Sequence, residues 1–189
     1  MHLCGMNRKL ATGEMGRKTI EEFKNAGKTP LLFILDNVRS ALNTGSVFRT
    51  ADAFLLEGII LCGYTATPPH RDLLKTALGA TETVNWEHYD NTLTAVIELK
   101  QQGWTVLAAE QTVSSTALDA YQPKPGEKLA LVFGNEVEGV QQEVINHCTG
   151  SIEIPQHGAK HSLNIAVCAG IVAWELSRKI REVNKITGS

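Results

Sequence analysis

The sequence predicts one α/β domain built around a parallel β-sheet, and three observations lead to this prediction. The chain has 189 residues, which suits a single domain able to bury its own core. Its 43% apolar and 20% charged residues are typical of a globular protein and argue against disorder or a coiled-coil rod. Short apolar runs alternate with segments of helical character, as expected when strands are buried between two layers of helices.

Strands are predicted where an apolar run is short and uninterrupted, because the strands of parallel sheets are buried on both faces. The predicted strands cover residues 31–35, 58–62, 104–109, 129–133 and 151–154, with a further candidate at 82–86. The first strand opens the proposed domain, residues 31–189. Residues 1–30 are expected to form a basic N-terminal extension with one short helix over 17–26.

Helices are predicted between the strands from apolar periodicity and from capping and stop residues. They cover residues 44–54, 71–78, 91–102, 141–148 and about 162–183. Asn43 is expected to cap the first of these and Ser162 the last. Asn91 or Thr92 is expected to cap the helix that Gly103 stops.

The last predicted helix is apolar almost all round its circumference over residues 163–174. Such a helix is normally buried on every side. At the end of a small domain, a second copy of the chain can cover it, and burial under the chain's own loops is the alternative. We therefore expect a homodimer in which this helix forms part of the interface.

The charge is unevenly distributed along the chain. The net charge of −2 argues against an overwhelmingly basic nucleic-acid binder, but residues 1–30 and 178–189 each carry +3, while residues 31–177 carry −8. Basic ends on an acidic body can place a positive patch beside a polyanion. The alternative is that the terminal Lys and Arg residues only keep the ends soluble.

The cysteines predict a reducing compartment. They show no CxxC spacing and lie mostly within apolar runs, so we expect reduced core thiols in a cytoplasmic protein. These residues are Cys4, Cys62, Cys148 and Cys168.

No apolar run approaches the roughly 20 residues of a membrane span. The N-terminus also lacks the apolar core of a signal peptide, and no membrane partner is expected.

Common motifs for phosphate binding, metal binding and serine nucleophiles do not occur. There is no GxxxxGK[ST] loop, no GxGxxG after a strand and no GxSxG elbow. Gly134 and Gly139 have the spacing that starts a phosphate loop, but Lys and Ser/Thr do not follow. His157 and His161 lack a third ligand in view, so no metal site is expected. Ser162 fits a helix cap better than a nucleophile.

Three segments follow predicted strands at the edge where parallel sheets bind their ligands. The first, N-T-G-S-V-F-R-T over residues 43–50, places Arg49 almost two turns beyond Asn43. A guanidinium there suits a phosphate, because its fork of donors matches two oxygens. The alternative is an arginine in a surface ion pair.

The second segment, G-N-E-V-E-G over residues 134–139, combines glycines that let backbone approach a ligand with two carboxylates. Glu136 and Glu138 disfavour anions and favour a ligand that carries positive charge or is held by backbone groups. The third, I-P-Q-H-G-A-K-H-S-L-N over residues 154–164, leads into the last helix, whose free N–H groups face the same edge. The alternative for each segment is a solvated turn.

Together, and in this order, the three segments resemble the motifs of the SpoU branch of the SPOUT superfamily of RNA methyltransferases. The first resembles that family's N-x-G-x-x-x-R motif, the second its G-N-E-x-x-G loop, and the third its I-P…S-L-N stretch that runs into a helix. The match spans about residues 31–180. The resemblance implies a homodimeric, Rossmann-like α/β domain with a C-terminal trefoil knot, a feature that no periodicity or spacing shows.

The resemblance also implies the reaction, which is methyl transfer from S-adenosyl-L-methionine to a ribose 2′-hydroxyl of RNA. The residues implied to bind the cofactor, mostly through backbone, are Ala108, Ala109, Glu110, Gly134, Asn135, Gly139, Ile154, Gln156, Ser162 and Leu163. The residues implied in catalysis are Arg49, Asn43, Glu136, Ser162 and Asn164. Arg49 would face the target nucleotide, with an approach across the dimer interface as one arrangement.

Elementary chemistry constrains the role of Arg49. A sulfonium is a good leaving group, so positioning can supply much of the rate. The family proposal makes the arginine the base, but a guanidinium stays protonated in proteins. We therefore expect Arg49 to clamp the adjacent phosphate and stabilise the developing alkoxide. Phosphate, Glu136 and water all stay open as acceptors of the proton.

Some features depart from the family pattern or leave alternatives. Gln156 stands where an apolar residue is commoner, and His157 and Lys160 make this loop basic. About 30 residues precede the core, which is short for a separate substrate domain and favours tRNA over rRNA.

The alternatives to this function are a base-methylating relative and a catalytically silent RNA-binding or assembly protein. The silent protein is expected to lack Arg49 or the loop glycines, which are present.

Overall fold

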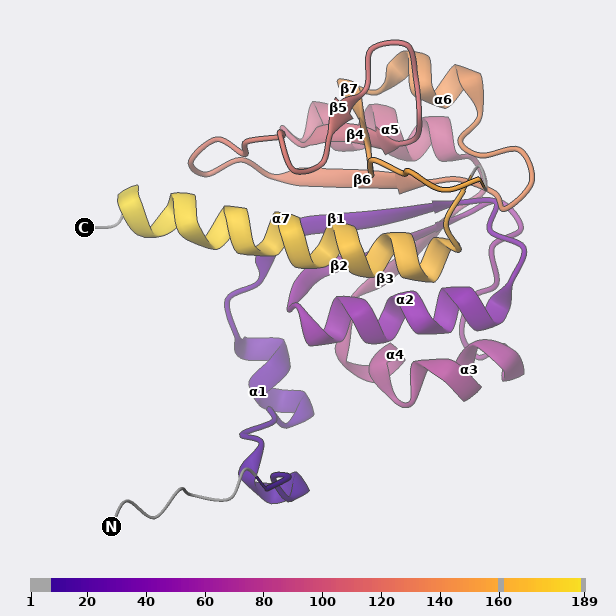
Figure 1. The fold of residues 1–189 in the computed structure, drawn as a ribbon. Helices are drawn as coiled ribbons and strands as arrows, with labels where there is room; N and C mark the ends of the chain where they lie inside the picture. The colour runs from indigo at the N-terminus through magenta and orange to yellow at the C-terminus, as the bar shows by residue number, and fades with distance from the viewer. Residues whose placement is uncertain (1–7, 160–161, 188–189) are drawn as a thin grey trace.

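The computed structural model describes residues 8–159 and 162–187, and Figure 1 shows their arrangement. One sheet of seven strands, in the order β3-β2-β1-β6-β4-β7-β5, forms the centre, and all its pairings are parallel. The strands are β1 (Thr29–Asp36), β2 (Leu56–Cys62), β3 (Trp86–Tyr89), β4 (Thr105–Ala109), β5 (Thr116–Ala117), β6 (Leu129–Phe133) and β7 (Gly150–Glu153). The predicted parallel α/β architecture is confirmed.

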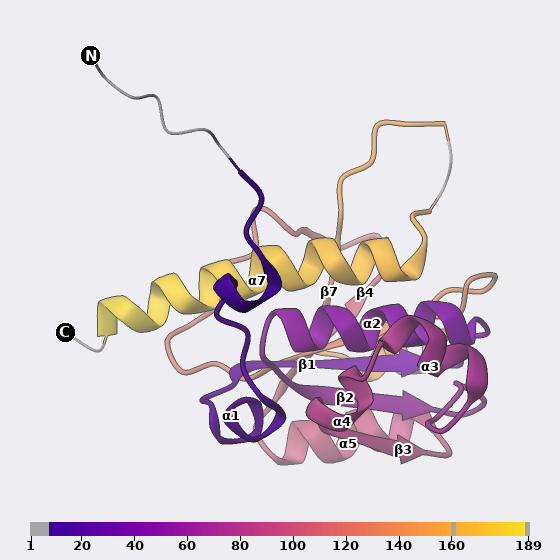
Figure 2. The same ribbon diagram turned by 90° about the horizontal axis from the view of Figure 1, so that it is seen from below.

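Helices cover both faces of the sheet. They are η1 (Thr12–Glu14), α1 (Ile20–Asn25), α2 (Ala41–Ala53), α3 (Arg71–Ala77), α4 (Ala80–Thr83), α5 (Thr92–Gln101), α6 (Gln142–His147) and α7 (Ile165–Thr187). Helices α2 and α7 lie side by side on one face, and α5 and α6 cover the other (Figures 1 and 2). Helices α3 and α4 pack against the outer side of α2, and α1 packs against α4.

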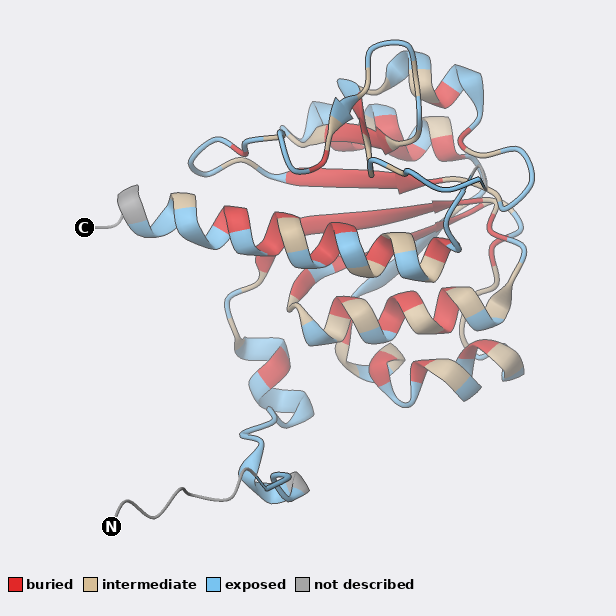
Figure 3. Ribbon diagram, in the orientation of Figure 1, coloured by how far each residue is buried: buried red, intermediate tan, exposed pale blue. Residues whose placement is uncertain are grey.

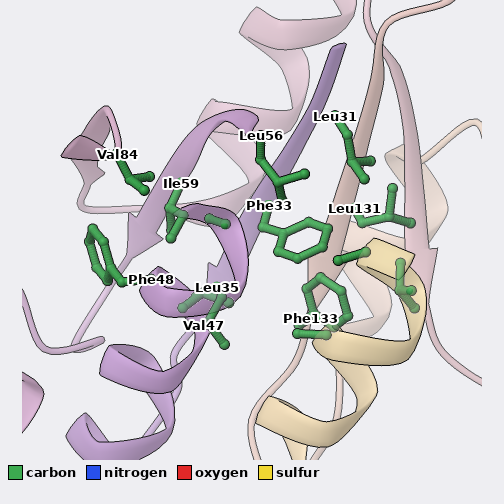
Figure 4. Close-up of a cluster of buried hydrophobic side chains, with 14 of the residues drawn as sticks. Leu31, Phe33, Leu35, Val47, Phe48, Leu56, Ile59, Val84, Leu131 and Phe133 are labelled. Atoms are coloured by element: carbon green, nitrogen blue, oxygen red, sulfur yellow. The ribbon is translucent and has the colours of Figure 1, made fainter. Parts of the chain in front are cut away.

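Strand β1 shows why both faces need cover. Its side chains alternate between the faces, as the two-residue period of a strand requires. Phe33 and its odd-numbered neighbours belong to the core cluster beneath α2 and α7, whereas Leu32 and Ile34 belong to the cluster beneath α5. Figure 4 shows the first cluster, where the rings of Phe33 and Phe133 meet edge to face at 4.8 Å. The central strands are therefore almost fully buried (Figure 3).

The predicted strand at 82–86 is wrong. Gly79, with φ +87°, begins a short helix, α4, and the strand starts only at Trp86. Strand β3 lies at the edge of the sheet and is mostly exposed, so its four residues form no apolar run. The two-residue edge strand β5 gave no signal for the same reason.

Two predicted helix caps are also wrong. Ser40, not Asn43, caps α2, because its hydroxyl accepts a hydrogen bond from the Asn43 N–H at 3.2 Å. Helix α7 begins at Ile165, and its N–H of Ala166 donates to the Asn164 side chain at 2.9 Å. Asn164 therefore occupies the capping role expected of Ser162, and both motif asparagines point toward the same region. The expected cap of α5 by Asn91 is confirmed.

Helix α7 buries one side and exposes the other. Residues such as Ala169, Val172 and Leu176 pack into the core beneath it. An outer stripe of apolar side chains, spaced three or four residues apart, stays between 37 and 62% exposed. We define this outer stripe as Leu163, Val167, Ile171 and Trp174. The chain's own described loops do not bury it, so this part of the helix still lacks the cover that its sequence predicts.

The three described cysteines are free thiols, as the sequence predicts. Cys62, Cys148 and Cys168 are free, and burial raises the pKa of Cys62 to about 12 and that of Cys148 and Cys168 to about 11. All three are therefore protonated, unreactive thiols at neutral pH, while Cys4 lies outside the described residues.

Within residues 8–159 and 162–187, no helix is both long and apolar enough to cross a bilayer.

Candidate functional site

A cavity of about 660 Å³ opens at the carboxyl ends of β4, β6 and β7, beside the start of α7. Its volume lies within the range of sites for small molecules and cofactors. The predicted cofactor-binding residues that line it are Ala109, Glu110, Gly134, Asn135, Gly139, Ile154, Gln156, Ser162 and Leu163. Ala108 does not line the cavity, because it is fully buried within β4 on the side facing α5.

The loop 134–139 forms one wall and depends on its two glycines. A Cβ on Gly134 would lie 2.0 Å from the carbonyl carbon of Gly139, which no side chain could tolerate. Gly139 has φ +71°, a conformation that favours glycine. Two backbone hydrogen bonds between Asn135 and Gly139, of 3.0 and 2.9 Å, close the loop. The backbone can therefore come as near to a ligand as the sequence pattern predicts.

The carboxylate of Glu136 joins this loop to the start of α2. It accepts hydrogen bonds from the backbone N–H of Arg39 at 2.9 Å and of Ser40 at 3.2 Å. It also accepts from the side-chain amide of Asn43 at 3.2 Å. A carboxylate at a helix N-terminus interacts favourably with the helix dipole. Glu136 thus occupies the anion position at the start of α2.

The pKa of Glu136 shows which protonation state this position favours. Burial alone raises the pKa of the carboxyl, but the hydrogen bonds from Arg39, Asn43 and Ser40 outweigh it, and the net pKa lies below the ordinary value. The group is therefore ionised at neutral pH. A general base works best with a pKa near the operating pH, so Glu136 is better suited to holding its neighbours than to accepting a proton.

A chain of side-chain hydrogen bonds connects all three predicted segments. The amide of Asn43 donates to Glu136, and its carbonyl oxygen accepts from the amide of Asn164 at 3.3 Å. Asn164 in turn caps α7. These residues are 93 and 121 positions apart in the sequence. The fold therefore brings together the segments at residues 43–50, 134–139 and 154–164 at one edge of the cavity.

The two remaining predicted catalytic residues differ in position. Ser162 is exposed and lines the cavity. Arg49 does not line it: the residue lies on an exposed part of α2, and no hydrogen bond or ion pair holds its guanidinium within the described residues. The implied role of Arg49 toward the target nucleotide, with an approach across the dimer interface as one arrangement, therefore stays a prediction.

Two carboxylates shape the site in ways that sequence reasoning missed. Asp36 is fully buried at the end of β1 and accepts hydrogen bonds from the Thr92 hydroxyl at 2.6 Å and the Gln141 N–H at 3.3 Å. Glu110, predicted to bind the cofactor, accepts from the Val140 N–H at 3.1 Å. Both therefore fix the loop that leaves β6. The available signal was an acidic residue directly after a buried apolar run.

The chemistry of the lining suits a cationic ligand with an apolar part. Acidic side chains at residues 110, 136, 138 and 153 border the cavity, and Phe133, Ile152 and Val172 supply apolar walls. Among the described residues, no group of three His, Cys, Asp or Glu side chains could hold a metal ion. His157 is exposed, and His161 lies outside the described residues.

Comparisons with known proteins agree with this geometry. The model of the SpoU rRNA Methylase family matches residues 30–174. The 23S rRNA (guanosine-2'-O-)-methyltransferase RlmB of Neisseria meningitidis is 31% identical over 82% of this chain. The chain spans 61 to 66% of the length of the first curated relatives that it matches.

Solved structures give the same picture. A TrmH/SpoU tRNA modifying enzyme from A. aeolicus matches with a TM-score of 0.77 and 25% identity, over 86% of this chain and 81% of that one. An AdoMet-bound rRNA methyltransferase from Sinorhizobium meliloti matches with a TM-score of 0.73 and 28% identity, over 84% of this chain and 59% of that one.

Proposed function

The chain belongs to the SpoU rRNA methylase family, and from this premise we propose that it methylates a ribose 2′-hydroxyl of RNA with S-adenosyl-L-methionine. The observation that carries the proposal is the hydrogen-bonded chain from Glu136 through Asn43 to Asn164. It joins the three motif segments at the edge of a cavity of suitable size. A protein that had kept only the fold would not need these polar contacts.

The cavity fits the proposed cofactor. When bound, the cofactor supplies an activated methyl group on a positively charged sulfur. The acidic lining favours that charge, and the apolar walls of Phe133, Ile152 and Val172 suit an adenine ring. Gly134 and Gly139 have no side chains, so the backbone along one wall is accessible to the cofactor. Most contacts with the cofactor are therefore made through main-chain groups.

Arg49 acts in the site of a second copy. Its guanidinium is exposed and unpaired among the described residues, and α2 lies beside α7, whose outer stripe needs cover. A homodimer formed through this stripe would bury the apolar side chains and bring α2 of one copy toward its partner. There the guanidinium clamps an RNA phosphate and stabilises the developing alkoxide. A homodimer thereby completes the active site.

The proton of the hydroxyl leaves to water or to an RNA phosphate. Arg49 stays protonated, and the lowered pKa of Glu136 keeps that carboxylate ionised as a hydrogen-bond acceptor. Glu136 instead holds Asn43 in place, and Asn43 holds Asn164. The rate then comes mainly from aligning the hydroxyl with the methyl group.

The proposed substrate class is tRNA. The support is the match to the A. aeolicus tRNA modifying enzyme, which extends over most of both chains, whereas the rRNA-modifying relative from N. meningitidis is matched over 61% of its length. We also propose that the reaction takes place in the cytoplasm, which suits the free thiols.

The test is transfer of labelled methyl from S-adenosyl-L-methionine to separate tRNA and rRNA pools, followed by nucleoside analysis. We expect label in a 2′-O-methyl nucleoside of the tRNA pool. Label only in rRNA would overturn the substrate class, and label on a base would overturn the ribose assignment. Cofactor binding without transfer to either pool would favour a silent RNA-binding protein.

A further inference from the structure

The loop 134–139 also borders a second, smaller hollow on the same edge of the sheet. This hollow has a volume of about 180 Å³ and lies next to Tyr64, just beyond the end of β2. The residues that line it are Asp36, Asn37, Tyr64, Asn135, Glu138, Gly139 and Gln141. It is too small for a cofactor, but it can receive the polar edge of one nucleobase.

Tyr64 is an exposed aromatic side chain that is held at both ends. The residue is 61% exposed, yet its backbone N–H donates to the Asn37 side chain at 3.3 Å. Its hydroxyl accepts a hydrogen bond from the side-chain amide of Asn135. That same amide also donates to the backbone carbonyl of Asn37 at 2.9 Å. The ring is therefore fixed at the surface, which spares a ligand the cost of ordering it.

The segment 37–40 links this ring to the proposed active site. At one end Asn37 contacts Tyr64, and at the other the N–H groups of Arg39 and Ser40 bind Glu136. The neighbouring Thr65 is buried and anchors the segment, because its hydroxyl accepts from the Val38 N–H at 2.9 Å. The fixed ring and the proposed site of methyl transfer are thus parts of one rigid edge.

Arg39 adds a positive charge at the end of this segment that binds Glu136. Its side chain is exposed, and within the described residues no hydrogen bond or ion pair engages its guanidinium. A guanidinium with free donors suits a phosphate of a nucleic-acid backbone. This edge therefore carries the cavity with Glu136, a cation on the adjoining segment, and an exposed aromatic ring beside a polar hollow.

We propose that Tyr64 stacks on the base of a nucleotide that flanks the methylated one, while Arg39 contacts the phosphate between them. The proposal rests on the proposed function, because it takes RNA as the substrate. Proteins commonly recognise unpaired RNA bases by stacking them on aromatic side chains, with hydrogen bonds to the base edges. The amide and carboxylate groups around the hollow, including Glu138 and Gln141, supply partners for such an edge.

The test compares Tyr64→Leu with Tyr64→Phe in the full chain, with total tRNA and total rRNA as separate probes. Loss of a stacking ring should weaken binding of the modified pool by about 5- to 100-fold, so Tyr64→Leu should bind that much more weakly. Tyr64→Phe keeps the ring and should stay within about twofold of wild type. Binding of S-adenosyl-L-methionine and the melting temperature should change little in either variant, which excludes a general structural defect.

Arg39→Gln tests the phosphate contact. It should weaken RNA binding and lower the slope of log Kd against log salt by about one. Lys124→Gln is the matched control. Lys124 is an exposed cation in the loop before β6, at the ends of the strands opposite the proposed site. It should alter neither quantity.

Three outcomes would overturn the proposal. Tyr64→Leu could bind RNA as wild type does, or Tyr64→Phe could lose as much affinity as Tyr64→Leu, which would assign the effect to the hydroxyl. The wild-type chain could also bind neither pool. These measurements record RNA binding and not turnover, so a chain that binds RNA but transfers no methyl would refute the proposed function while still testing Tyr64.

Discussion

Arg49 on α2 and Lys179 on α7 are cations on neighbouring helices with opposite surroundings. Lys179 is only 6% exposed, and its ammonium uses every donor that it has. Its partners are the backbone carbonyls of Leu118 at 3.1 Å, Asp119 at 2.7 Å and Tyr121 at 2.7 Å, with a carboxylate oxygen of Glu175 at 3.2 Å. Arg49 is exposed, and no described residue engages its guanidinium.

The difference separates a structural cation from one available to a ligand. A buried ammonium is tolerated only when its hydrogen bonds are satisfied within the protein. Lys179 meets that condition by fixing residues 118–121 against α7. Arg49 has five donors and no partner for them among the described residues, which supports the proposed contact with an external phosphate. The following predictions test this division of roles.

The largest expected effect is on catalysis, for Arg49→Ala. Removing a donor that stabilises developing charge typically costs about 10²- to 10³-fold in kcat, and we expect a loss of at least this size. Affinity for S-adenosyl-L-methionine should stay near wild type, because Arg49 does not line the cavity. Steady-state kinetics and calorimetry of cofactor binding measure the two quantities. Near-normal turnover would remove Arg49 from the mechanism.

Mixed dimers show in which subunit Arg49 acts. Gly134→Val should block the cavity wall, because even a Cβ at this position clashes with Gly139. Neither Arg49→Ala nor Gly134→Val should be active alone. A mixture should regain activity if Arg49 reaches across the interface, since mixed dimers then contain one intact site. Activity that stays absent after proven subunit exchange would place Arg49 in its own subunit's site.

The next effect is on stability, for Lys179→Met. Methionine keeps much of the side-chain volume but leaves three carbonyls, one buried and two partly buried, without their donor. An unsatisfied buried polar group costs about 1–3 kcal/mol, so the free energy of unfolding should fall by about 3 kcal/mol. Denaturant titration measures it. Lys185→Met on the same helix, at an exposed position, should change it by less than about 0.5 kcal/mol. Equal effects of both variants would contradict the comparison.

A fourth prediction concerns the outer stripe of α7. Ile171→Asp places a charge in the proposed interface and should convert the dimer to a monomer while activity is lost, because Arg49 then has no partner site. Ile97→Asp on α5 is a matched control: the two isoleucines are 38 and 39% exposed and lie on opposite faces of the sheet. Light scattering should show half the wild-type mass for the first variant only. A wild-type chain that is already monomeric would contradict the proposed dimer.

The sequence predicted the central strands because burial on both faces leaves a readable apolar run. Strand β6, for example, was predicted at its observed bounds. The edge strands β3 and β5 were not predicted, because they are short and polar. Asn43 and Asn164 were identified by their motifs, but their contact across 121 residues depends on the whole fold. The three carbonyl partners of Lys179 lie about 60 residues away and have no pattern at all.

The trefoil knot stays a prediction that follows from the family. Periodicity, capping residues and spacing describe neighbours in the sequence, whereas a knot describes the order in which distant segments cross. For the same reason the separation of Arg49 from its own cavity could not be predicted. The motif specifies which side chain is present, and the helix geometry of α2 decides which chain's site it can reach.

The smallest expected effect is the pH-dependent contribution of Glu136. Its pKa is lowered in the folded state, so its ionised form stabilises the fold above the ordinary pKa of 4.5. That stabilisation is lost as the pH falls through the folded-state pKa. Glu136→Gln should therefore lower the free energy of unfolding by about 0.3–1 kcal/mol at pH 7, as for a charge at a helix N-terminus. The difference should vanish in acid.

The same variant decides whether Glu136 carries the proton. If the carboxylate only holds Asn43 and the start of α2, Glu136→Gln should lower kcat and leave the shape of the pH–rate profile unchanged. A base would instead impose an acidic limb on the wild-type profile that the glutamine variant lacks. Glu57→Gln, at an exposed position of β2, controls for loss of one negative charge. A missing limb in Glu136→Gln alone would make this carboxylate the proton acceptor and reverse its assigned role.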